Sequence, residues 1–332
     1  MTAGRPIAIA VAVAAFFAAS MLGVAVGAVV IAPGAILTAL VHPAVTRGEV
    51  APILWSLRIP RVLEAAVVGA ALAVAGTLMQ GMLRNPLVDP FLTGASAGSA
   101  CAIALAIAAG VASPYLPLLA FAAALATVAF VATLARNGSG LSPERLILAG
   151  IAVSTLLASV VTLVILLDPN TSTTLGILAW IGGSLTGRGW PELRWATVYA
   201  VLGVGAALGL APTLNAMRLG ERRARALGVD VDRARWAILG AASLLTAAAV
   251  SLSGLVGFVG LIVPHVARRL VGSDARWLIP ASALLGASGV ILADALARSA
   301  APPLELPLGV LLAILGVPAF VYLSFRRRPA AE

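Results

Sequence analysis

The sequence consists of long apolar runs separated by short polar breaks. A helix needs about 20 mainly apolar residues to cross the roughly 30 Å hydrocarbon core of a bilayer. Ten runs are predicted to be membrane-spanning helices on this basis: Ile7–Ile31, Val62–Leu83, Leu92–Val111, Leu116–Ala135, Leu146–Leu167, Leu193–Leu214, Trp236–Leu252, the short Leu255–Ala267, Trp277–Leu296 and Leu306–Phe325. A further stretch, Thr173–Ser184, is too short and glycine-rich to span, and we expect it to lie at the membrane surface or to re-enter the membrane.

An alternative for the first run is a secretory signal peptide, since Arg5 precedes it. The apolar region of a signal peptide covers about 7–15 residues. Ile7–Ile31 is longer than that, so we expect a retained first span.

The composition supports a membrane protein. Apolar residues make up 61% of the 332 residues and charged residues 11%, whereas soluble domains carry about 45–50% and about 25%. The net charge of +9 does not indicate nucleic-acid binding, because the basic residues lie at the ends of apolar runs. All 22 basic residues are arginine, and without lysine the chain has no phosphate-binding loop of the Walker-A type. Any ATP that drives this protein must therefore be hydrolysed elsewhere.

The arginines also orient the chain, because cytoplasmic loops of membrane proteins are enriched in basic residues. With ten spans and a cytoplasmic N-terminus, sixteen of the 22 arginines lie in inside segments. The six that break this bias are Arg47, Arg58, Arg61, Arg188, Arg194 and Arg298. The sequence therefore predicts that both termini are cytoplasmic.

Small residues indicate close helix packing. Gly69, Ala73 and Gly76 share one face of the second predicted span, and Gly94 and Gly98 open the third. Such residues let helix backbones approach each other in lipid. Cys101 is expected to be a small packing residue, and one cysteine with two distant histidines predicts no metal site.

The acidic residues argue against ion coupling. Glu64, Asp168, Asp294 and Glu305 fall near predicted helix ends, whereas ion-coupled transporters usually carry ionisable groups in the bilayer interior. Asp294 and Arg298 are four residues apart, so an ion pair on one helix is one interpretation of both.

The longest polar stretch, Asn215–Arg235, is predicted to lie on the cytoplasmic face. Helix formers around Glu221–Leu227 precede Gly228, a residue type that often ends helices. Two short helices that dock a partner suit this segment, and the alternative is a solvated basic loop.

Seven strings carry a resemblance to a known family. They are RIPR at Arg58–Arg61, GAALAVAGTLMQGMLRNPLVDPFLTGASAG at Gly69–Gly98, LILAG at Leu146–Gly150, LGERRARALGV at Leu219–Val229, LSGLVGFVGLIVPHVARRLVG at Leu252–Gly272, ADALAR at Ala293–Arg298 and ELPLGVLLAILGVPAF at Glu305–Phe320. In this order and spacing, the chain resembles the permeases of type II ABC importers for vitamin B12, haem and ferric siderophores. The first span and the loops at 41–57 and 168–192 match only in character.

The resemblance implies an all-α polytopic permease fold of about ten transmembrane helices, with residues 1–332 as a single transmembrane domain. It implies a homodimer in the bacterial inner membrane, with the substrate pathway along the dimer interface. Two ATPase subunits would bind ATP and Mg²⁺ on the cytoplasmic side, and a periplasmic binding protein would deliver the substrate. The chain itself would carry no catalytic residue, cofactor or metal.

The resemblance also assigns roles to residues. Arg58, Arg61 and Arg298 look like the outer arginines that pair with acidic residues of the binding protein. The segment about 215–235 holds the expected ATPase-coupling element, whose residues are Leu219, Gly220, Glu221, Arg225, Leu227 and Gly228. The expected inner gate consists of the turn Asn85, Pro86 and Leu87 and the opposing Ser142, Pro143 and Glu144. Relatives often carry small hydroxyl residues at the SPE position, and His265 in the VPH string resembles a structural residue.

The substrate stays open at this point. Haem, a ferric siderophore and cobalamin are all large chelates, and a nearly uncharged, apolar pathway favours haem slightly. An ion-coupled secondary transporter is the alternative function, and it predicts transport without a partner ATPase.

Overall fold

In the computed structural model, the described residues are 4–27, 31–32, 34, 36, 38, 52–138, 140–301 and 304–325. The loop arginine Arg47 and the basic end of the sequence, Arg326–Glu332, lie outside the described residues.

Helices dominate the described part of the chain. The main helices are α1 (Gly4–Ala25), α4 (Ile59–Met82), α5 (Ala95–Ala108), α6 (Leu116–Leu134), α7 (Pro143–Leu167), α8 (Thr171–Gly182), α9 (Trp190–Gly209), α10 (Ala211–Arg218), α11 (Glu221–Ala226), α12 (Val231–Ser253), α13 (Val259–Val271), α14 (Ala275–Ser299) and α15 (Leu308–Phe325). A π-helical turn, η1 (Ile53–Arg58), leads into α4, and the 3₁₀ turns η2 (Pro90–Thr93) and η3 (Ser113–Tyr115) precede α5 and α6. The strands β1 (Arg136–Asn137) and β2 (Gly140–Leu141) form a small antiparallel hairpin.

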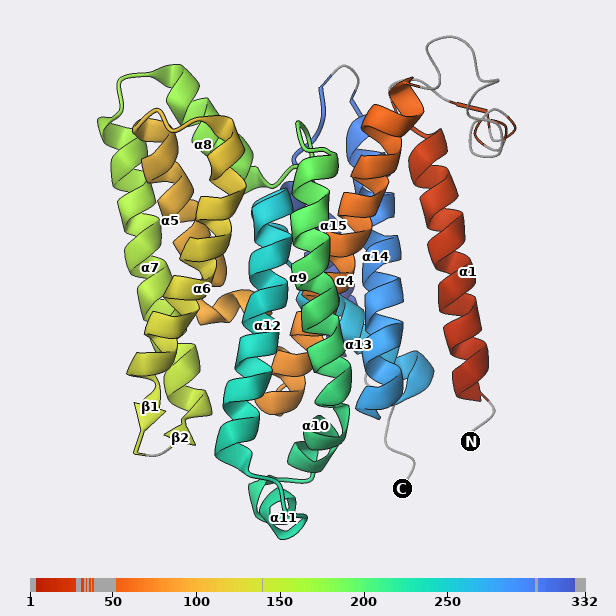
Figure 1. Ribbon diagram of the computed structural model, residues 1–332, viewed down its shortest axis with the longest axis vertical. Coiled ribbons are helices and arrows are strands. Elements are labelled where there is room, and N and C mark those ends of the chain that lie inside the picture. The colour runs from red at the N-terminus through yellow and green to blue at the C-terminus, as the bar shows by residue number, and fades with distance from the viewer. Residues whose placement is uncertain are drawn as a thin grey trace.

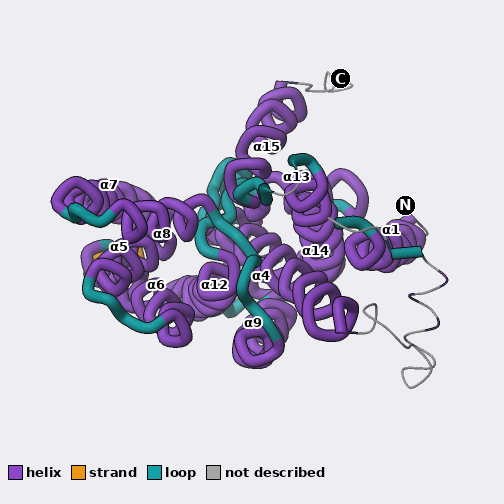
Figure 2. The backbone as a smooth tube through the Cα atoms, turned by 90° about the horizontal axis from the view of Figure 1, so that it is seen from above, coloured by secondary structure: helices purple, strands orange, loops and turns teal. Residues whose placement is uncertain are grey.

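The long helices run side by side, and α4 lies at their centre (Figures 1 and 2). Helices α5 to α8 form a group on one side of α12, whereas α1 and α14 lie on the other side. Helix α15 projects from the bundle (Figure 2). We call the two ends of the bundle the α11 end and the α8 end. Helix α1 begins and α15 ends at the α11 end (Figure 1).

Each predicted span corresponds to a helix, but not every helix is long enough to cross a bilayer. Among the described residues, six helical segments have the required length and apolarity, namely Gly4–Ala25, Ile53–Met82, Ser113–Leu134, Pro143–Leu167, Val231–Ser253 and Ala275–Ser299. Counting the bent pair α9 and α10 as one span gives seven. The helices α5 and α13 have 14 and 13 residues, so the count of ten remains a prediction. The stretch expected at the membrane surface forms the short helix α8.

The predicted span Leu193–Leu214 is wrong in one respect, because it is not one continuous helix. Helix α9 ends at Gly209, and α10 departs at an angle of 51°. Pro212 stands in the first turn of α10, where its missing N–H costs nothing. The chain thus turns at this point to leave the bundle at the α11 end.

The predicted small-residue faces pack as expected. A side chain at Gly69 would collide with the Gly286 carbonyl of α14, and one at Gly76 would collide with the Gly260 carbonyl of α13. Gly98 is similarly close to Thr127 of α6. Backbone-to-backbone contact of this kind needs glycine on the facing surface, and it explains how α4 stays buried among its neighbours.

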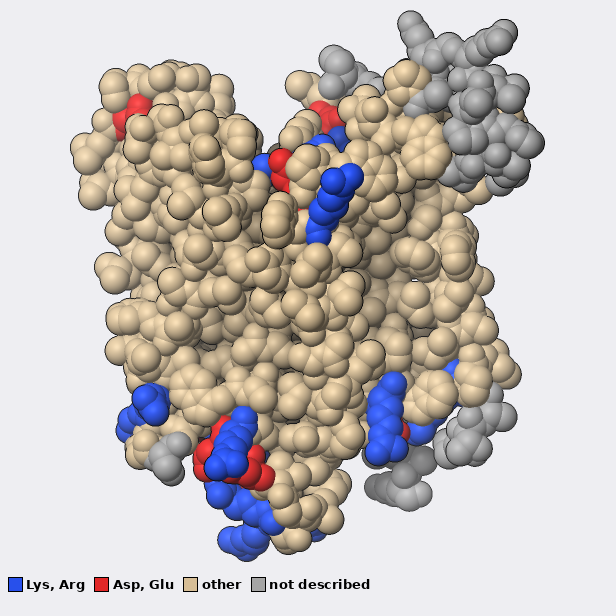
Figure 3. All heavy atoms as spheres, in the orientation of Figure 1, with Lys and Arg blue, Asp and Glu red and all other residues tan. Residues whose placement is uncertain are grey.

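Charged side chains gather toward the two ends of the molecule and leave a broad uncharged band between them (Figure 3). Exposed leucines on α7 and α9, such as Leu156 and Leu202, lie between those ends. An apolar belt between two charged rims is the surface expected of a protein that spans a bilayer.

Candidate functional site

A cluster of charged side chains joins three segments at the α8 end. The guanidinium of Arg61, on α4, donates from Nε and Nη2 to Asp294 Oδ1 of α14, each at 3.0 Å. It also donates to Glu305 in the loop before α15, at 3.1 Å from Nη1 to Oε1 and 2.8 Å from Nη2 to Oε2. Thr186 donates to the same Glu305 Oε2 at 2.7 Å. We call Arg58, Arg61, Asp294, Arg298 and Glu305 the outer charge cluster.

Two other arginines of the outer charge cluster bind the end of α1. Arg298 donates to Gly23 O at 2.9 Å and to Val26 O at 3.1 Å, and Arg58 donates to Val26 O at 2.6 Å. The last carbonyls of a helix have no partner within the helix, and a cation there complements the negative end of its dipole. Arg298 also pairs with Asp294 at 2.9 Å, which confirms the predicted i,i+4 pair.

The structure thus brings the three predicted docking arginines together but turns them inward. Arg58 and Arg298 are 8% and 6% exposed. The Arg61 side chain is 15% exposed, and its partner Glu305 is 38% exposed. Among the described residues, the cluster consists of three guanidinium groups and two carboxylates, and Arg61 and Arg298 pair with those carboxylates. Docking through these arginines remains a prediction, and Glu305 marks where the cluster is accessible.

Glu64 lies near the start of a helix, as expected. It lies one turn after Arg61 on α4 and is completely buried. Neither of its carboxylate oxygens has a hydrogen-bond partner among the residues that the structure describes. The spacing of three residues between Arg61 and Glu64 does not predict this burial. The burial depends on how α4 packs against the other helices of the bundle.

Two short helices are present at the α11 end, of which one lies within the predicted polar segment and the other begins before it, at Ala211. They are α10 and α11, and α11 forms the tip of the molecule (Figure 1). Gly228 ends α11 as predicted, with φ at +82°. Its N–H donates to Arg225 O, and the N–H of Val229 donates to Ala224 O, each at 3.0 Å. This pair of bonds is a Schellman motif, in which a left-handed glycine closes the helix.

Ion pairs hold α11 against α12. Arg235 of α12 is 8% exposed and pairs with Glu221 at the start of α11. Arg225 pairs with Asp232 at 3.3 Å. Leu219 and Leu227, which flank α11, are 54% and 64% exposed. A firmly held short helix with exposed apolar side chains is suited to transmit force to or from a partner.

The predicted gate segments serve as local turns and lie near the coupling segment. Asn85 Oδ1 accepts from Leu87 N at 2.9 Å, which closes the turn after α4, and Pro86 follows within that turn. Ser142 caps α7, its Oγ accepting from Arg145 N at 3.4 Å and donating to Glu144 at 3.0 Å, while Pro143 occupies the first turn of α7.

A small cavity of about 60 Å³ connects these segments to α11. Its lining includes Arg84, Pro143, Glu144, Glu221 and Arg235. Arg84 directly precedes Asn85 and adopts a left-handed backbone with φ at +51°. The structure therefore places the end of α4, the start of α7 and the start of α11 around one point. The resemblance implied that the turn after α4 opposes the start of α7, but it did not place α11 beside them, because no spacing along the chain links Glu221 to those segments.

Helix α7 exposes hydroxyl groups along one line. Thr155, Ser159 and Thr162 are exposed, and each donates to the backbone carbonyl four residues earlier. Their spacing of four and three residues puts them on one face of the helix. Each hydroxyl oxygen keeps lone pairs, so this face of α7 can still accept hydrogen bonds from water or from a polar ligand.

His265 lies on α13, where its Nε2 is 3.2 Å from Arg269 Nη2. Within the described residues, no group of three histidine, cysteine or acidic side chains could hold a metal ion. The site features are therefore charged contacts, turns and packing surfaces.

Comparison with known proteins identifies the family that this chain matches. Residues 13–326 match the FecCD transport family. The chain is 41% identical over 284 residues to the hemin transport system permease protein HmuU of Yersinia pestis, covering 83% of this chain and 84% of that protein. It is 38% identical over 277 residues to the Fe(3+)-citrate import system permease protein YfmD of Bacillus subtilis, covering 83% and 82%.

The fold agrees with these relatives. A solved structure of a metal-chelate type ABC transporter in an inward-facing conformation superposes with a TM-score of 0.87 at 30% identity, covering 97% of this chain and all of that chain. The sequence-based expectation of an importer permease is confirmed. The alternative of an ion-coupled secondary transporter receives no support.

Proposed function

This chain belongs to the FecCD transport family and is a permease subunit of an ABC importer, and from that premise we propose how it is assembled and driven. It acts as a homodimer with two ATPase subunits at the α11 end, which faces the cytoplasm. A substrate-binding protein docks at the α8 end. The chain performs no chemistry, and ATP and Mg²⁺ bind to the partner subunits.

The coupling segment at α11 carries this proposal. It forms the tip of the molecule, presents Leu219 and Leu227 to solvent, and is held to α12 through Glu221 and Arg235. Closure of two ATPase subunits around ATP would push on α11. The pairs to α12 and the cavity shared with Arg84 and Glu144 would pass that push to the gate segments.

The outer charge cluster supports docking at the opposite end. A carboxylate of a binding protein can reach Arg61 at the exposed side now occupied by Glu305. Exchange of one carboxylate for another there keeps the buried guanidinium paired, which avoids the cost of an unpaired buried charge. The Arg58 and Arg298 contacts with α1 would hold the cluster in place.

The substrate pathway lies along the exposed face of α7 in the dimer. Thr155, Ser159 and Thr162 would line it with hydroxyls and no fixed charge. Weak polar contacts allow a large ligand to pass without being trapped. The substrate is a metal chelate of the haem, ferric-siderophore or cobalamin type. The slight preference for haem from the apolar sequence is not strengthened by this hydroxyl line, which suits a polar chelate equally.

Reconstitution tests the proposal. The chain is co-expressed with a candidate ATPase and binding protein, and the complex is weighed by native mass spectrometry before it is placed in proteoliposomes. We expect two permeases with two ATPases, and uptake of one chelate that requires ATP and resists ionophores. Uptake that follows an imposed ion gradient without the ATPase would reject it.

A further inference from the structure

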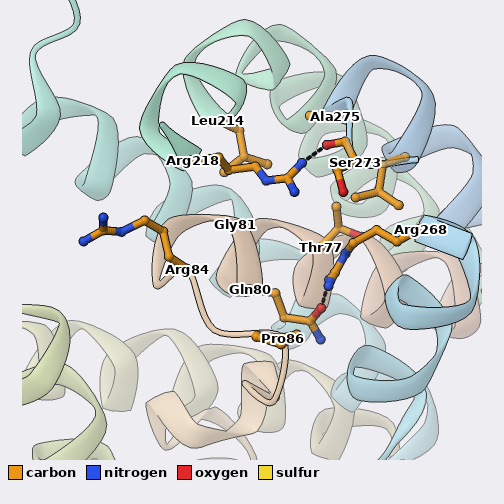
Figure 4. Close-up of a pocket in the computed structure, with 11 residues that line it drawn as sticks. Thr77, Gln80, Gly81, Arg84, Pro86, Leu214, Arg218, Arg268, Ser273 and Ala275 are labelled. Carbon is orange, nitrogen blue, oxygen red and sulfur yellow. Dashed lines mark hydrogen bonds between the residues drawn. The ribbon is translucent and has the colours of Figure 1, made fainter. Parts of the chain in front are cut away.

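A second, larger cavity opens at the α11 end and is lined by parts of α4, α10, α13 and the start of α14. Its volume is about 390 Å³, within the range of roughly 300–1,000 Å³ typical of small-ligand sites. Thr77 and Gln80 form its buried floor, at 1% and 4% exposed. Figure 4 shows the side chains of Arg218 and Arg268 reaching over this floor from opposite sides, whereas the Arg84 side chain points away.

Among the residues that the structure describes, the hydrogen-bond acceptors of both guanidinium groups are neutral. Arg218 Nη1 donates to the carbonyl oxygen of Ser273, and Arg268 Nη2 donates to Gln80 Oε1. Each of these bonds uses one nitrogen of a group that offers five donors in a planar fork. The two arginines therefore keep donors for a further ligand, and their like charges repel each other across the cavity.

Asp274, which lies between the lining residues Ser273 and Ala275, has other partners. Asp274, at the start of α14, accepts from Asn215 Nδ2 at 2.7 Å and from Arg276 N at 3.1 Å, and lies 3.8 Å from Arg5. The Asn215 amide and these neighbours hold the pKa of Asp274 below its usual value. The Asp274 carboxylate thus already has hydrogen-bond and ion-pair partners, and Asp274 is not among the residues that line the cavity.

We propose that Arg218 and Arg268 bind a phosphate group in this cavity. Phosphate oxygens match the guanidinium fork, and two such forks facing one cavity can share one phosphate. Basic pockets between membrane helices on the cytoplasmic side also hold the head groups of anionic lipids. The phosphate would come either from a phospholipid of the inner leaflet or from the cytoplasm. This proposal rests on the proposed cytoplasmic orientation of the α11 end, but not on the substrate or on the docking partners proposed above.

The geometry favours a small anion over an acidic side chain of the ATPase. The cavity is lined by residues of α4, α10, α13 and α14. Helix α11, which contributes no lining residue, forms the tip of the molecule (Figure 1). A partner that seats on α11 would meet Leu219 and Leu227 first. A partner carboxylate would have to enter a concave site floored by Thr77 and Gln80.

The test uses the full chain, purified with its ATPase. Native mass spectrometry detects a retained phospholipid, and calorimetry with inorganic phosphate in lipid-free detergent detects a free anion. The variant Arg218→Gln/Arg268→Gln removes both forks. The control Arg276→Gln removes an exposed arginine that does not line the cavity. Circular dichroism and thermal unfolding establish that each variant is folded, and Arg268→Lys keeps the charge without the fork.

We expect the double variant to lose the bound phospholipid, or to bind inorganic phosphate at least tenfold more weakly, while Arg276→Gln binds as the parent does. Arg268→Lys should fall between them. A phospholipid signal assigns the lipid source, and phosphate binding alone assigns the free anion. Equal binding by the double variant and the control would overturn the proposal. It would also be overturned if neither probe bound and the double variant lost only its association with the ATPase.

Discussion

Arg61 of α4 binds Asp294 of α14 through two nitrogen atoms, Nε and Nη2, each 3.0 Å from Oδ1. The two residues are 233 positions apart in the sequence, and the Asp294 side chain is 2% exposed. Asp294 also pairs with Arg298. One carboxylate thus joins the buried Arg298 and the partly buried Arg61 at the point where the outer charge cluster meets the helix bundle.

Asp294→Asn should destabilise the protein strongly. It would leave Arg298, which is 6% exposed, without the carboxylate that pairs with it. Removing one partner of a buried ion pair costs about 3–5 kcal/mol. Thermal unfolding in detergent should show a clearly lower midpoint. Asp168→Asn is the control, since Asp168 Oδ1 accepts only a local bond from Asn170 N. Similar midpoints for both variants would contradict a stabilising role of the cluster.

Glu305→Gln should strengthen binding of the substrate-binding protein. The change removes the carboxylate that competes for Arg61 at its exposed side. We expect a severalfold lower dissociation constant by surface plasmon resonance on reconstituted complexes. Burial raises the pKa of Glu305, but hydrogen bonds from Arg61 and Thr186 outweigh burial and hold the pKa below its usual value.

Glu305 is therefore ionised at any pH above the ordinary glutamate value of about 4.3, and the gain should be the same from pH 6 to pH 8. Arg61→Gln should instead weaken docking. If Glu305→Gln weakens docking as well, Glu305 does not compete with the binding protein but contacts it.

Arg235→Gln should uncouple the ATPase from transport. The arginine is buried and pairs with Glu221 at the start of α11, and its loss leaves only the more exposed Arg225–Asp232 pair of the two ion pairs described between α11 and α12. We expect the complex to assemble and hydrolyse ATP, with uptake per ATP reduced about tenfold or more. Arg233→Gln is the matched control, because the Arg233 side chain is 89% exposed. Uptake unchanged in Arg235→Gln would exclude this route for coupling.

Gly76→Ala should disturb the packing of α4 against α13, since a methyl group there would collide with the Gly260 carbonyl. Overpacking of a close helix contact costs about 1–3 kcal/mol. The measurement is the yield and thermal midpoint of the purified protein. Gly205→Ala on α9 has open space around the new methyl group and should behave as the parent does. If Gly76→Ala has the thermal midpoint of the parent, α4 and α13 can move apart without loss of stability, and the predicted role of this contact is contradicted.

The hydroxyl line of α7 can be mapped with cysteine labelling. Cys101 is the single cysteine of the sequence, so Cys101→Ser gives a cysteine-free background. In that background, Thr155→Cys and Ser159→Cys should react with a water-soluble thiol reagent, and loaded substrate should slow the reaction. Leu118→Cys on α6 is the control, because Leu118 is 65% exposed on an apolar helix. Equal protection from the reagent at all three positions would place α7 in lipid.

Much of the fold can be predicted from the sequence, because the residues that specify each feature lie close together along the chain. Apolar runs located the long helices, the four-residue spacing allowed an Asp294–Arg298 pair, and Gly228 predicted the end of α11. Gly69 and Gly76 predicted close packing because only glycine permits backbone contact across α4.

The remaining features depend on contacts between distant segments. Whether Arg61 faces solvent or Asp294 is decided by how α4 meets α14, and hydropathy does not encode that contact. The burial of Glu64 and the facing arginines Arg218 and Arg268 arise in the same way. The bend before Pro212 lies within an apolar run, so hydropathy alone predicts one continuous span there.

The most direct test of the account measures ATP hydrolysis in proteoliposomes that contain this chain, its ATPase and its binding protein. The binding protein is added empty, then loaded in turn with haem, a ferric siderophore and cobalamin. The account predicts that one loaded form raises hydrolysis severalfold, and that Arg58→Glu/Arg61→Glu abolishes the rise but not basal hydrolysis. If hydrolysis is indifferent to every loaded form, or if no complex with an ATPase assembles, the proposed importer mechanism is contradicted.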